Sequence, residues 1–222
     1  MPIIDAWLKL YTAAVKRAFG GRIKFIGIQG SYARGEADEN SDIDVVLILD
    51  ALSLEDLNIY RDAIAELPER EKICGFVSGA DELRGWEASD ILQFCFETIA
   101  IEGSLGGLLP RPDRADAERA VRIGAGNIYH IAAHNFLHGR KTHTLKGLYK
   151  SAVFVLQARY YLKTGEYISK KSDLMKAADG SDAEILRLGA KIKAADVLTD
   201  GELEGYTAAL LCWAGGILAK QA

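Results

Sequence analysis

The sequence predicts an α+β protein whose first half combines strands with helices and whose second half is a bundle of helices. Three observations support this prediction. Short apolar segments of strand length occur only in the first half, amphipathic segments with helical spacing fill the second half, and residues 109–113 contain two prolines that interrupt both patterns. We therefore expect two domains, at residues 1–109 and 110–222.

The first domain is expected to begin with an amphipathic helix over residues 3–19, which Gly20 and Gly21 end. Residues 24–29 are expected to form a strand, and residues 43–49 a second strand that is buried on both faces. A helix over 54–67 follows, with Ser53 as its N-cap, and then a third strand over 73–77. Residues 81–86 resemble a helical turn, whereas residues 91–105 fit neither pattern clearly.

The second domain shows helical periodicity throughout. Gly-containing breaks follow several of the helical segments. The helices are expected over residues 114–138, 144–163, 170–178, 182–193 and 201–219. Segments of this kind that follow one another without strands favour a helical bundle.

Composition and charge exclude several classes of protein. The chain has 222 residues, of which 49% are hydrophobic and 26% charged, as is usual for a soluble globular protein. Its net charge of −4 argues against long nucleic acid as a partner. No signal peptide and no apolar run of membrane-spanning length is visible, so a membrane is not expected either. The three cysteines lack a paired spacing, which favours reduced thiols in the cytoplasm. The oligomeric state is left open.

Two carboxylates at the start of the second strand are the first candidate site residues. Asp42 and Asp44 are two residues apart, and side chains with that spacing on a strand point to the same face. Like charges this close repel each other unless a cation lies between them. Mg²⁺ is the cation that fits, because it prefers oxygen ligands and shares its coordination shell with phosphates.

A candidate phosphate loop precedes these carboxylates. Gly30 and Ser31 follow the first strand and are expected to open a helical turn, where a glycine lets backbone N–H groups approach a phosphate and the helix dipole favours an anion. Arg34 either contacts the phosphates or ties the loop together. The sequence therefore predicts a site for Mg-NTP, in which the α-phosphate can be attacked by an acceptor hydroxyl.

The pattern Gly-Ser-x(10)-Asp-x-Asp resembles the signature of the DNA polymerase β-like nucleotidyltransferase superfamily. Gly30, Ser31, Asp42 and Asp44 match its fixed positions, and Ser41 belongs to the best-kept core of the motif, residues 41–45. The resemblance implies a small mixed sheet with helices in the first domain. It also implies that Asp42 and Asp44 are catalytic residues that bind Mg²⁺, with Gly30, Ser31, Arg34 and Ser41 around the nucleotide.

A second resemblance extends into the helical domain. The order of the domains is similar to that of bacterial aminoglycoside adenylyltransferases of the streptomycin/spectinomycin type. Trp86, residues 91–94 (Ile-Leu-Gln-Phe) and the Thr-Gly-x-x-x-Ser-Lys segment that ends at Lys170 are similar to segments of that branch. The resemblance implies that Lys170 contacts the triphosphate of ATP. The alternative makes Ser169 an ordinary N-cap and Lys170 a solvated charge.

The sequence departs from the superfamily at one position. A third carboxylate, which serves as metal ligand or general base, is usual on the strand beside Asp-x-Asp. Here the resemblance places Cys74 near that position, and soft sulfur does not replace a carboxylate as a ligand of Mg²⁺. Glu71, Asp81 and Glu97 are the nearest acidic residues, and we expect each of them at the surface.

Three histidines, His130, His134 and His138, lie four residues apart on one expected helix, so they share one face. Polar contacts at a domain interface, contact with the acceptor and a Zn²⁺ site are the alternatives. The Zn²⁺ site is disfavoured because no carboxylate or cysteine joins them at ligand spacing.

Together these features predict a nucleotidyltransferase that transfers a nucleoside monophosphate, AMP from ATP, to an acceptor hydroxyl and releases pyrophosphate. The acceptor is either an aminoglycoside-like small molecule or a protein hydroxyl, since some small members of the superfamily are AMP-transferring antitoxins. A nucleotide-binding regulatory or antitoxin-like protein with weak or no activity is the alternative, and the missing third carboxylate motivates it. A structural protein with a vestigial motif is a third reading.

Overall fold

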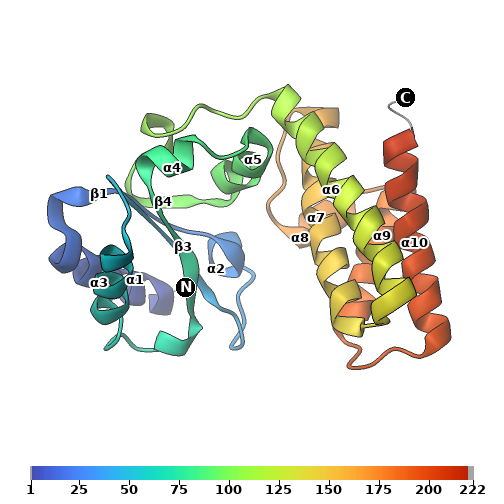
Figure 1. The fold of residues 1–222 in the computed structure, drawn as a ribbon, viewed down its shortest axis with the longest axis horizontal. Helices are drawn as coiled ribbons and strands as arrows, with labels where there is room; N and C mark the ends of the chain where they lie inside the picture. The colour runs from blue at the N-terminus through green and yellow to red at the C-terminus, as the bar shows by residue number, and fades with distance from the viewer. Residues whose placement is uncertain (1, 220–222) are drawn as a thin grey trace. The chain divides into compact units, whose positions relative to one another are not determined.

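The structure, a computed structural model, describes residues 2–219 and divides after Arg111 into two compact units (Figure 1). The first unit contains every strand of the described chain together with several helices. Its helices are α1 (Pro2–Phe19), α2 (Gly30–Arg34), α3 (Leu54–Ala63), α4 (Ala80–Arg84) and α5 (Ala88–Glu97). Its strands are β1 (Ile23–Ile28), β2 (Ile43–Leu49), β3 (Ile73–Gly79) and β4 (Ile99–Gly103). Three single turns of 3-10 helix connect them, at Gly20–Arg22, Arg70–Lys72 and Leu105–Gly107.

The four strands form one mixed sheet in the order β3-β2-β1-β4. Strand β1 is antiparallel to both β2 and β4, whereas β2 and β3 are parallel. A parallel pair needs a crossover, and α3 lies in the connection between its two strands. The predicted fold class is therefore confirmed: a small mixed sheet with helices, followed by a helical region.

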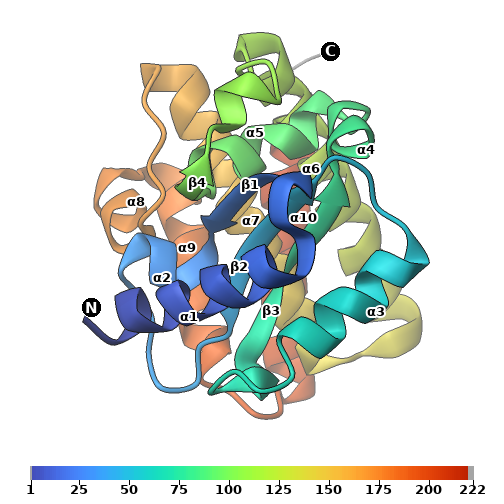
Figure 2. The ribbon, with the colours of Figure 1, turned by 90° about the vertical axis from the view of Figure 1, so that its left-hand side faces the viewer.

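The sheet is covered on both faces. Alternate residues of β2, including Val45 and Leu47, belong to a buried cluster with α1, and α1 and α3 lie in front of the strands in Figure 2. The other face of β2, with Val46 and Ile48, belongs to a second buried cluster with residues of α4 and α5. Burial of β2 on both faces, as predicted, explains its apolar sequence.

The start of β1 and the end of β2 are joined by a network of hydrogen bonds around Arg22, the residue before β1. Its Nη1 donates to Asp56 Oδ1 at 2.5 Å and its Nε donates to Asp50 Oδ1 at 3.0 Å. Asp56 also forms a capping box with Ser53, which confirms Ser53 as the N-cap of α3. Hydrogen bonds from Arg22 and Ser53 hold the pKa of the Asp56 carboxyl well below its usual range.

Two predictions about the first unit are corrected. The helix predicted over 54–67 ends at Ala63, and turns complete the segment before Pro68, whose carbonyl accepts a hydrogen bond from Trp7. The ambiguous segment 91–105 contains the end of α5, the strand β4 and a 3-10 turn. The helix ends at Glu97 and the strand begins at Ile99, with Thr98 between them.

The second unit consists of helices alone within the described residues 112–219. They are α6 (Arg114–His134), α7 (Thr142–Thr164), α8 (Lys171–Ala177), α9 (Gly180–Lys193) and α10 (Asp200–Ala219), with a π-helical turn at Asn135–Gly139. The helix predicted over 114–138 thus changes to a π turn after His134, where the Asn135 side chain bonds both the N–H and the carbonyl of Lys141. Over residues 2–219, no helix combines the length and the apolar character needed to cross a membrane.

Candidate active site

The predicted carboxylates lie at the beginning of β2. Asp44 lies on the same face of β2 as Val46 and Ile48. Unlike these two buried residues, it is partly exposed. Asp42 is exposed and lies one residue before the strand. A buried strand thus fixes the position of Asp44, which is the one partly exposed residue of β2.

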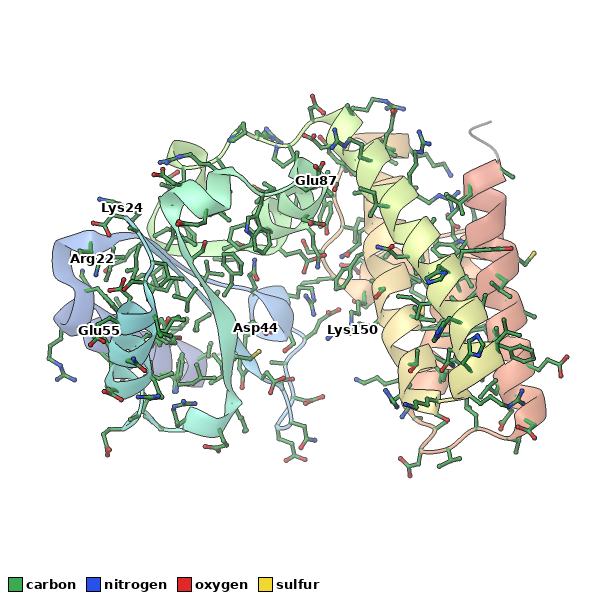
Figure 3. The ribbon with its side chains drawn as sticks, viewed as in Figure 1. Arg22, Lys24, Asp44, Glu55, Glu87 and Lys150 are labelled. Atoms are coloured by element: carbon green, nitrogen blue, oxygen red, sulfur yellow. The ribbon has the colours of Figure 1, made fainter. Side chains whose placement is uncertain are left out.

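Gly30 lies directly against the carboxylate of Asp44. A Cβ added to Gly30 would be 1.8 Å from Asp44 Oδ2 and 2.8 Å from Asp44 Cγ. Gly30 also has a φ of +69°, in the left-handed region that favours glycine. Figure 3 shows Asp44 beside α2, the short helix that Gly30 opens. The structure therefore brings the predicted phosphate loop and one of the predicted metal ligands into contact.

The backbone around α2 is fixed at both ends. The Gln29 N–H donates to the Asp44 carbonyl at 2.8 Å, which continues the pairing of β1 with β2 up to the helix. At the other end Gly35 has a left-handed φ of 70° and closes the helix, and the Glu36 N–H donates to the Ser31 carbonyl at 2.8 Å. The N–H groups of the first turn, around Ser31, have no acceptor within a helix of this kind, which suits an anionic ligand.

Arg34 is engaged by two carboxylates of its own unit. Its Nη1 lies 2.7 Å from Glu97 Oε2 and its Nε lies 3.1 Å from Glu36 Oε2. The side chains of Arg34 and Glu97 are 13% and 4% exposed. Of the two roles left open for Arg34, this arrangement fits the one in which it ties the loop together.

Ser41 lies in a tight turn with Asp38. The Ser41 hydroxyl donates to Asp38 Oδ1 at 3.1 Å and accepts from the Asp38 N–H at 2.9 Å. In this arrangement Ser41 shapes the turn that leads into Asp42, and its contact with a nucleotide stays a prediction.

On the other side of β2, Cys74 of β3 is the register partner of Asp44. Partners in neighbouring strands point to the same face, so the Cys74 side chain, which is exposed, lies beside the Asp44 carboxylate. The described residues contain no group of three or more His, Cys, Asp and Glu side chains that could hold a metal ion. The departure from the superfamily pattern thus extends to the structure.

One of the three acidic candidates was placed wrongly. Glu71 and Asp81 are exposed as expected, but Glu97 is buried, with 5% of its surface exposed, because it pairs with Arg34. The spacing of α5 contained the signal for this. Ile91, Phe94 and Glu97 follow one another at intervals of three, which places Glu97 on the buried face of the helix.

Sequence reasoning also missed Gln29 and Thr98. Gln29 Nε2 donates to Thr98 Oγ1 at 2.5 Å, which connects the residue before Gly30 to the residue before β4. The pairing of β1 with β4 brings these residues together, and no short-range pattern in the sequence predicts that pairing.

The remaining predicted residues belong to the second unit. Lys170 is exposed and precedes the first turn of α8, so its contact with a triphosphate stays a prediction. His130, His134 and His138 form an exposed row, with ring centroids 6.2 Å and 4.8 Å apart, and none of them is part of a metal-binding group among residues 2–219.

Two known proteins are similar to this chain, one in sequence and one in fold. A protein of Methanocaldococcus jannaschii, whose name gives protein adenylylation as its proposed activity, is 46% identical over 43 residues, which are 19% of this chain and 43% of that relative. The crystal structure of spectinomycin adenyltransferase AAD(9) from Enterococcus faecialis, with ATP and spectinomycin, has a similar fold. Its TM-score is 0.59 at 12% identity, over 95% of this chain and 98% of that one.

The family model matches the first unit alone. It covers residues 8–96, which include β1, β2, β3 and all four residues of the Gly-Ser and Asp-x-Asp motif. The predicted resemblance is therefore confirmed, and residues 8–96 of this chain match the nucleotidyltransferase domain family.

Proposed function

We propose that this protein is an adenylyltransferase, which transfers AMP from ATP to a hydroxyl group of an acceptor. The observation that supports it best is the contact between Gly30 and the Asp44 carboxylate, because it brings the predicted phosphate loop next to a predicted metal ligand. The match of residues 8–96 to the nucleotidyltransferase domain supports the same reaction class. The cytoplasmic location expected from the cysteines is part of this proposal.

The residues at the site fit Mg²⁺. Asp42 and Asp44 supply oxygen ligands two residues apart, and Mg²⁺ in nucleotide sites binds through one or two carboxylates together with substrate phosphates. Gly30 leaves open the space beside Asp44 Oδ2 that a side chain would fill. Bound Mg²⁺ would reduce the repulsion between carboxylates and phosphates and withdraw charge from the phosphate that reacts.

In the proposed reaction, the acceptor oxygen forms a bond to the α-phosphorus of ATP. The bond from that phosphorus to the oxygen bridging to the β-phosphate breaks, and pyrophosphate leaves with the electron pair. The first turn of α2, from Gly30 and Ser31, would hold the phosphates of the leaving group through its N–H groups. The hydroxyl proton passes to solvent or to a carboxylate of the acceptor site, since the Cys74 position does not supply a carboxylate.

Two classes of acceptor are supported by separate observations. The fold shared with a spectinomycin adenyltransferase favours an aminoglycoside-like small molecule. The 43-residue match to a protein with proposed protein adenylylation activity favours a hydroxyl on a protein. The likeness over nearly the whole chain makes the small molecule our first choice.

A nucleotide-binding protein with weak or no transfer activity is the second candidate function. It is favoured by Cys74, which lies opposite Asp44 where the superfamily usually has a carboxylate. This candidate shares the nucleotide site with the first and lacks only efficient turnover.

Calorimetry with ATP and Mg²⁺ tests the part that both candidates share. We expect the wild type to bind, and Asp42→Ala/Asp44→Ala to abolish binding without unfolding the protein. Asp62→Ala, which replaces an exposed carboxylate of the same unit, serves as the control. Release of pyrophosphate with a panel of aminoglycosides and protein acceptors then separates the enzyme from the binder. Absence of binding in the wild type would refute both.

A further inference from the structure

We propose that Glu97 and Thr98 are positioning residues that hold residues 29–36, which contain the predicted phosphate loop, against Asp44. They are adjacent in the chain, at the corner where α5 passes into β4. We call this pair the corner, and residues 29–36 the loop. The inference rests on the proposed function for what the loop binds, but its structural part can be tested without a nucleotide.

The corner first holds the beginning of the loop through a hydroxyl group. Thr98 Oγ1 accepts a hydrogen bond from Gln29 Nε2 and donates one to the Phe94 carbonyl, both at 2.5 Å. The second bond fixes the orientation of the hydroxyl relative to the last turn of α5. Gln29 is the N-cap of α2, so this contact fixes the position of the residue directly before Gly30.

The strand before the loop is shaped to accept Thr98. A Cβ added to Gly27 would be 2.8 Å from the Thr98 methyl and 2.6 Å from the Phe25 ring. Gly27 lies in β1, two residues before Gln29, which directly follows the strand in extended backbone, so the two positions point to the same side. A larger residue at position 27 would therefore push Thr98 away from the side chain it binds.

The corner then holds the end of the loop through a buried ion pair. Glu97 Oε2 lies 2.7 Å from Arg34 Nη1, and Arg34 is the last residue of α2. Glu36, which is 24% exposed, pairs with the other side of the same guanidinium. Because both side chains are largely buried, loss of Arg34 would remove the cation paired with the Glu97 carboxylate, which is costly, whereas loss of the Glu97 charge leaves Arg34 paired with Glu36.

A helix as short as α2 depends on such attachments. It has five residues, and isolated helices of that length are not stable in water. The corner itself is rigid, because α5 contributes Ile91 and Phe94 to the buried cluster and β4 pairs with β1. One rigid element thus holds both ends of α2, and the result is the close approach of Gly30 to Asp44.

Three variants test this role. Thr98→Val keeps the shape and removes the hydroxyl, Thr98→Ser keeps the hydroxyl, and Glu97→Gln removes the charge while Glu36 still balances Arg34. We expect Thr98→Val and Glu97→Gln each to weaken Mg-ATP binding about tenfold in calorimetry, and Thr98→Ser to restore most of the affinity. Glu102→Gln, which breaks the exposed pair with Lys16, is the control and should leave the affinity unchanged.

Hydrogen exchange of the free protein provides the readout that does not need a nucleotide. Amides of the loop should exchange about tenfold faster in Thr98→Val and Glu97→Gln, whereas amides of β2 should keep their wild-type rates. Equal acceleration in β2 would mean that the corner only stabilises the fold, and it would overturn the inference, as would unchanged loop exchange. If wild-type protein fails to bind Mg-ATP, the proposed function is refuted and loop exchange alone decides about the corner.

Discussion

The two neighbours of β2 differ in how completely they form the site. On the β1 side, the loop is held at both ends by Glu97 and Thr98, and Gly30 fits against the Asp44 carboxylate. On the β3 side, the partner of Asp44 is Cys74, whose exposed side chain cannot bind Mg²⁺ as a carboxylate would. The contrast indicates that the side expected to bind the phosphates is specified closely, whereas the side expected to activate the acceptor is not.

Among the variants that test this contrast, Gly30→Ala is expected to change Mg-ATP affinity most. A Cβ at this position would overlap the Asp44 carboxylate, so the loop and Asp44 would have to separate. We expect Mg-ATP affinity to fall on the order of 100-fold, since misplacement of a site by about 1 Å has effects of that size. Calorimetry measures the loss.

Gly20→Ala provides the matched control for that change. Gly20 also has a positive φ, of +53°, but an added Cβ would have open space around it. It should cost about 1 kcal/mol in the free energy of unfolding through backbone strain and leave the affinity unchanged. Equal loss of affinity in both variants would attribute the effect to strain, and would contradict a role for the Gly30–Asp44 contact.

Cys74→Glu tests the β3 side of the site by placing a carboxylate beside Asp44. With Mg²⁺ and an acceptor that is a substrate, we expect the rate of pyrophosphate release to rise at least about tenfold, as a positioned general base contributes that much or more. Without Mg²⁺ the melting temperature should fall, because two carboxylates would then lie side by side. Cys74→Ser, which adds no charge, should change neither quantity. A rate that is the same in all three proteins would place the base elsewhere.

Lys170→Ala tests whether the second unit assists the first. Residues 112–222 carry 16 Lys and Arg against 12 Asp and Glu, whereas residues 1–111 carry 11 against 19, so positive charge for a triphosphate is more abundant in the second unit. We expect Mg-ATP affinity to fall about fivefold, with a smaller loss for AMP, which lacks the β- and γ-phosphates. Lys176→Ala removes another exposed lysine of α8 and should have no effect on either ligand.

The smallest effect on nucleotide binding is expected from a change at Asp56, which lies near the start of β1 and the end of β2, away from Gly30 and Asp44. Because the folded-state pKa of Asp56 is lowered, its contribution to stability is complete above the usual carboxyl range near pH 4 and is lost as the pH falls below it. Asp56→Asn should therefore lower the melting temperature at pH 7, and the difference from wild type should narrow at pH 3. Mg-ATP affinity should not change, and a change would mean that stability at this end reaches the site.

The part of the fold that follows from local patterns was predicted from the sequence. Strands 24–29, 43–49 and 73–77 and the helices of the second unit were placed within a few residues, because apolar periodicity determines them. Strand β4 was not, since it is short, has an irregular burial pattern and depends on its pairing with β1. The order of the strands likewise follows from contacts between residues far apart in the chain.

The candidate site divides in the same way. Gly30, Ser31, Asp42 and Asp44 were predicted as site residues because their spacing is a local signal, and the structure places Gly30 against Asp44. Glu97 was named only as an acidic candidate expected at the surface, and Thr98 was not named, because a carboxylate 63 residues from Arg34 has no local pattern in common with it. Burial of an acidic side chain depends on the partner that neutralises it, and the sequence alone does not name that partner.

The close approach of Gly30 to Asp44 also constrains how the two positions can change in evolution or design. A side chain at position 30 would displace the Asp44 carboxylate and would also be strained by the positive φ, so we expect a protein that keeps this aspartate in place to keep the glycine. Residues 30 and 44 should therefore vary together among related chains. A designer who wished to move this site into another sheet would have to transfer both positions in a single step.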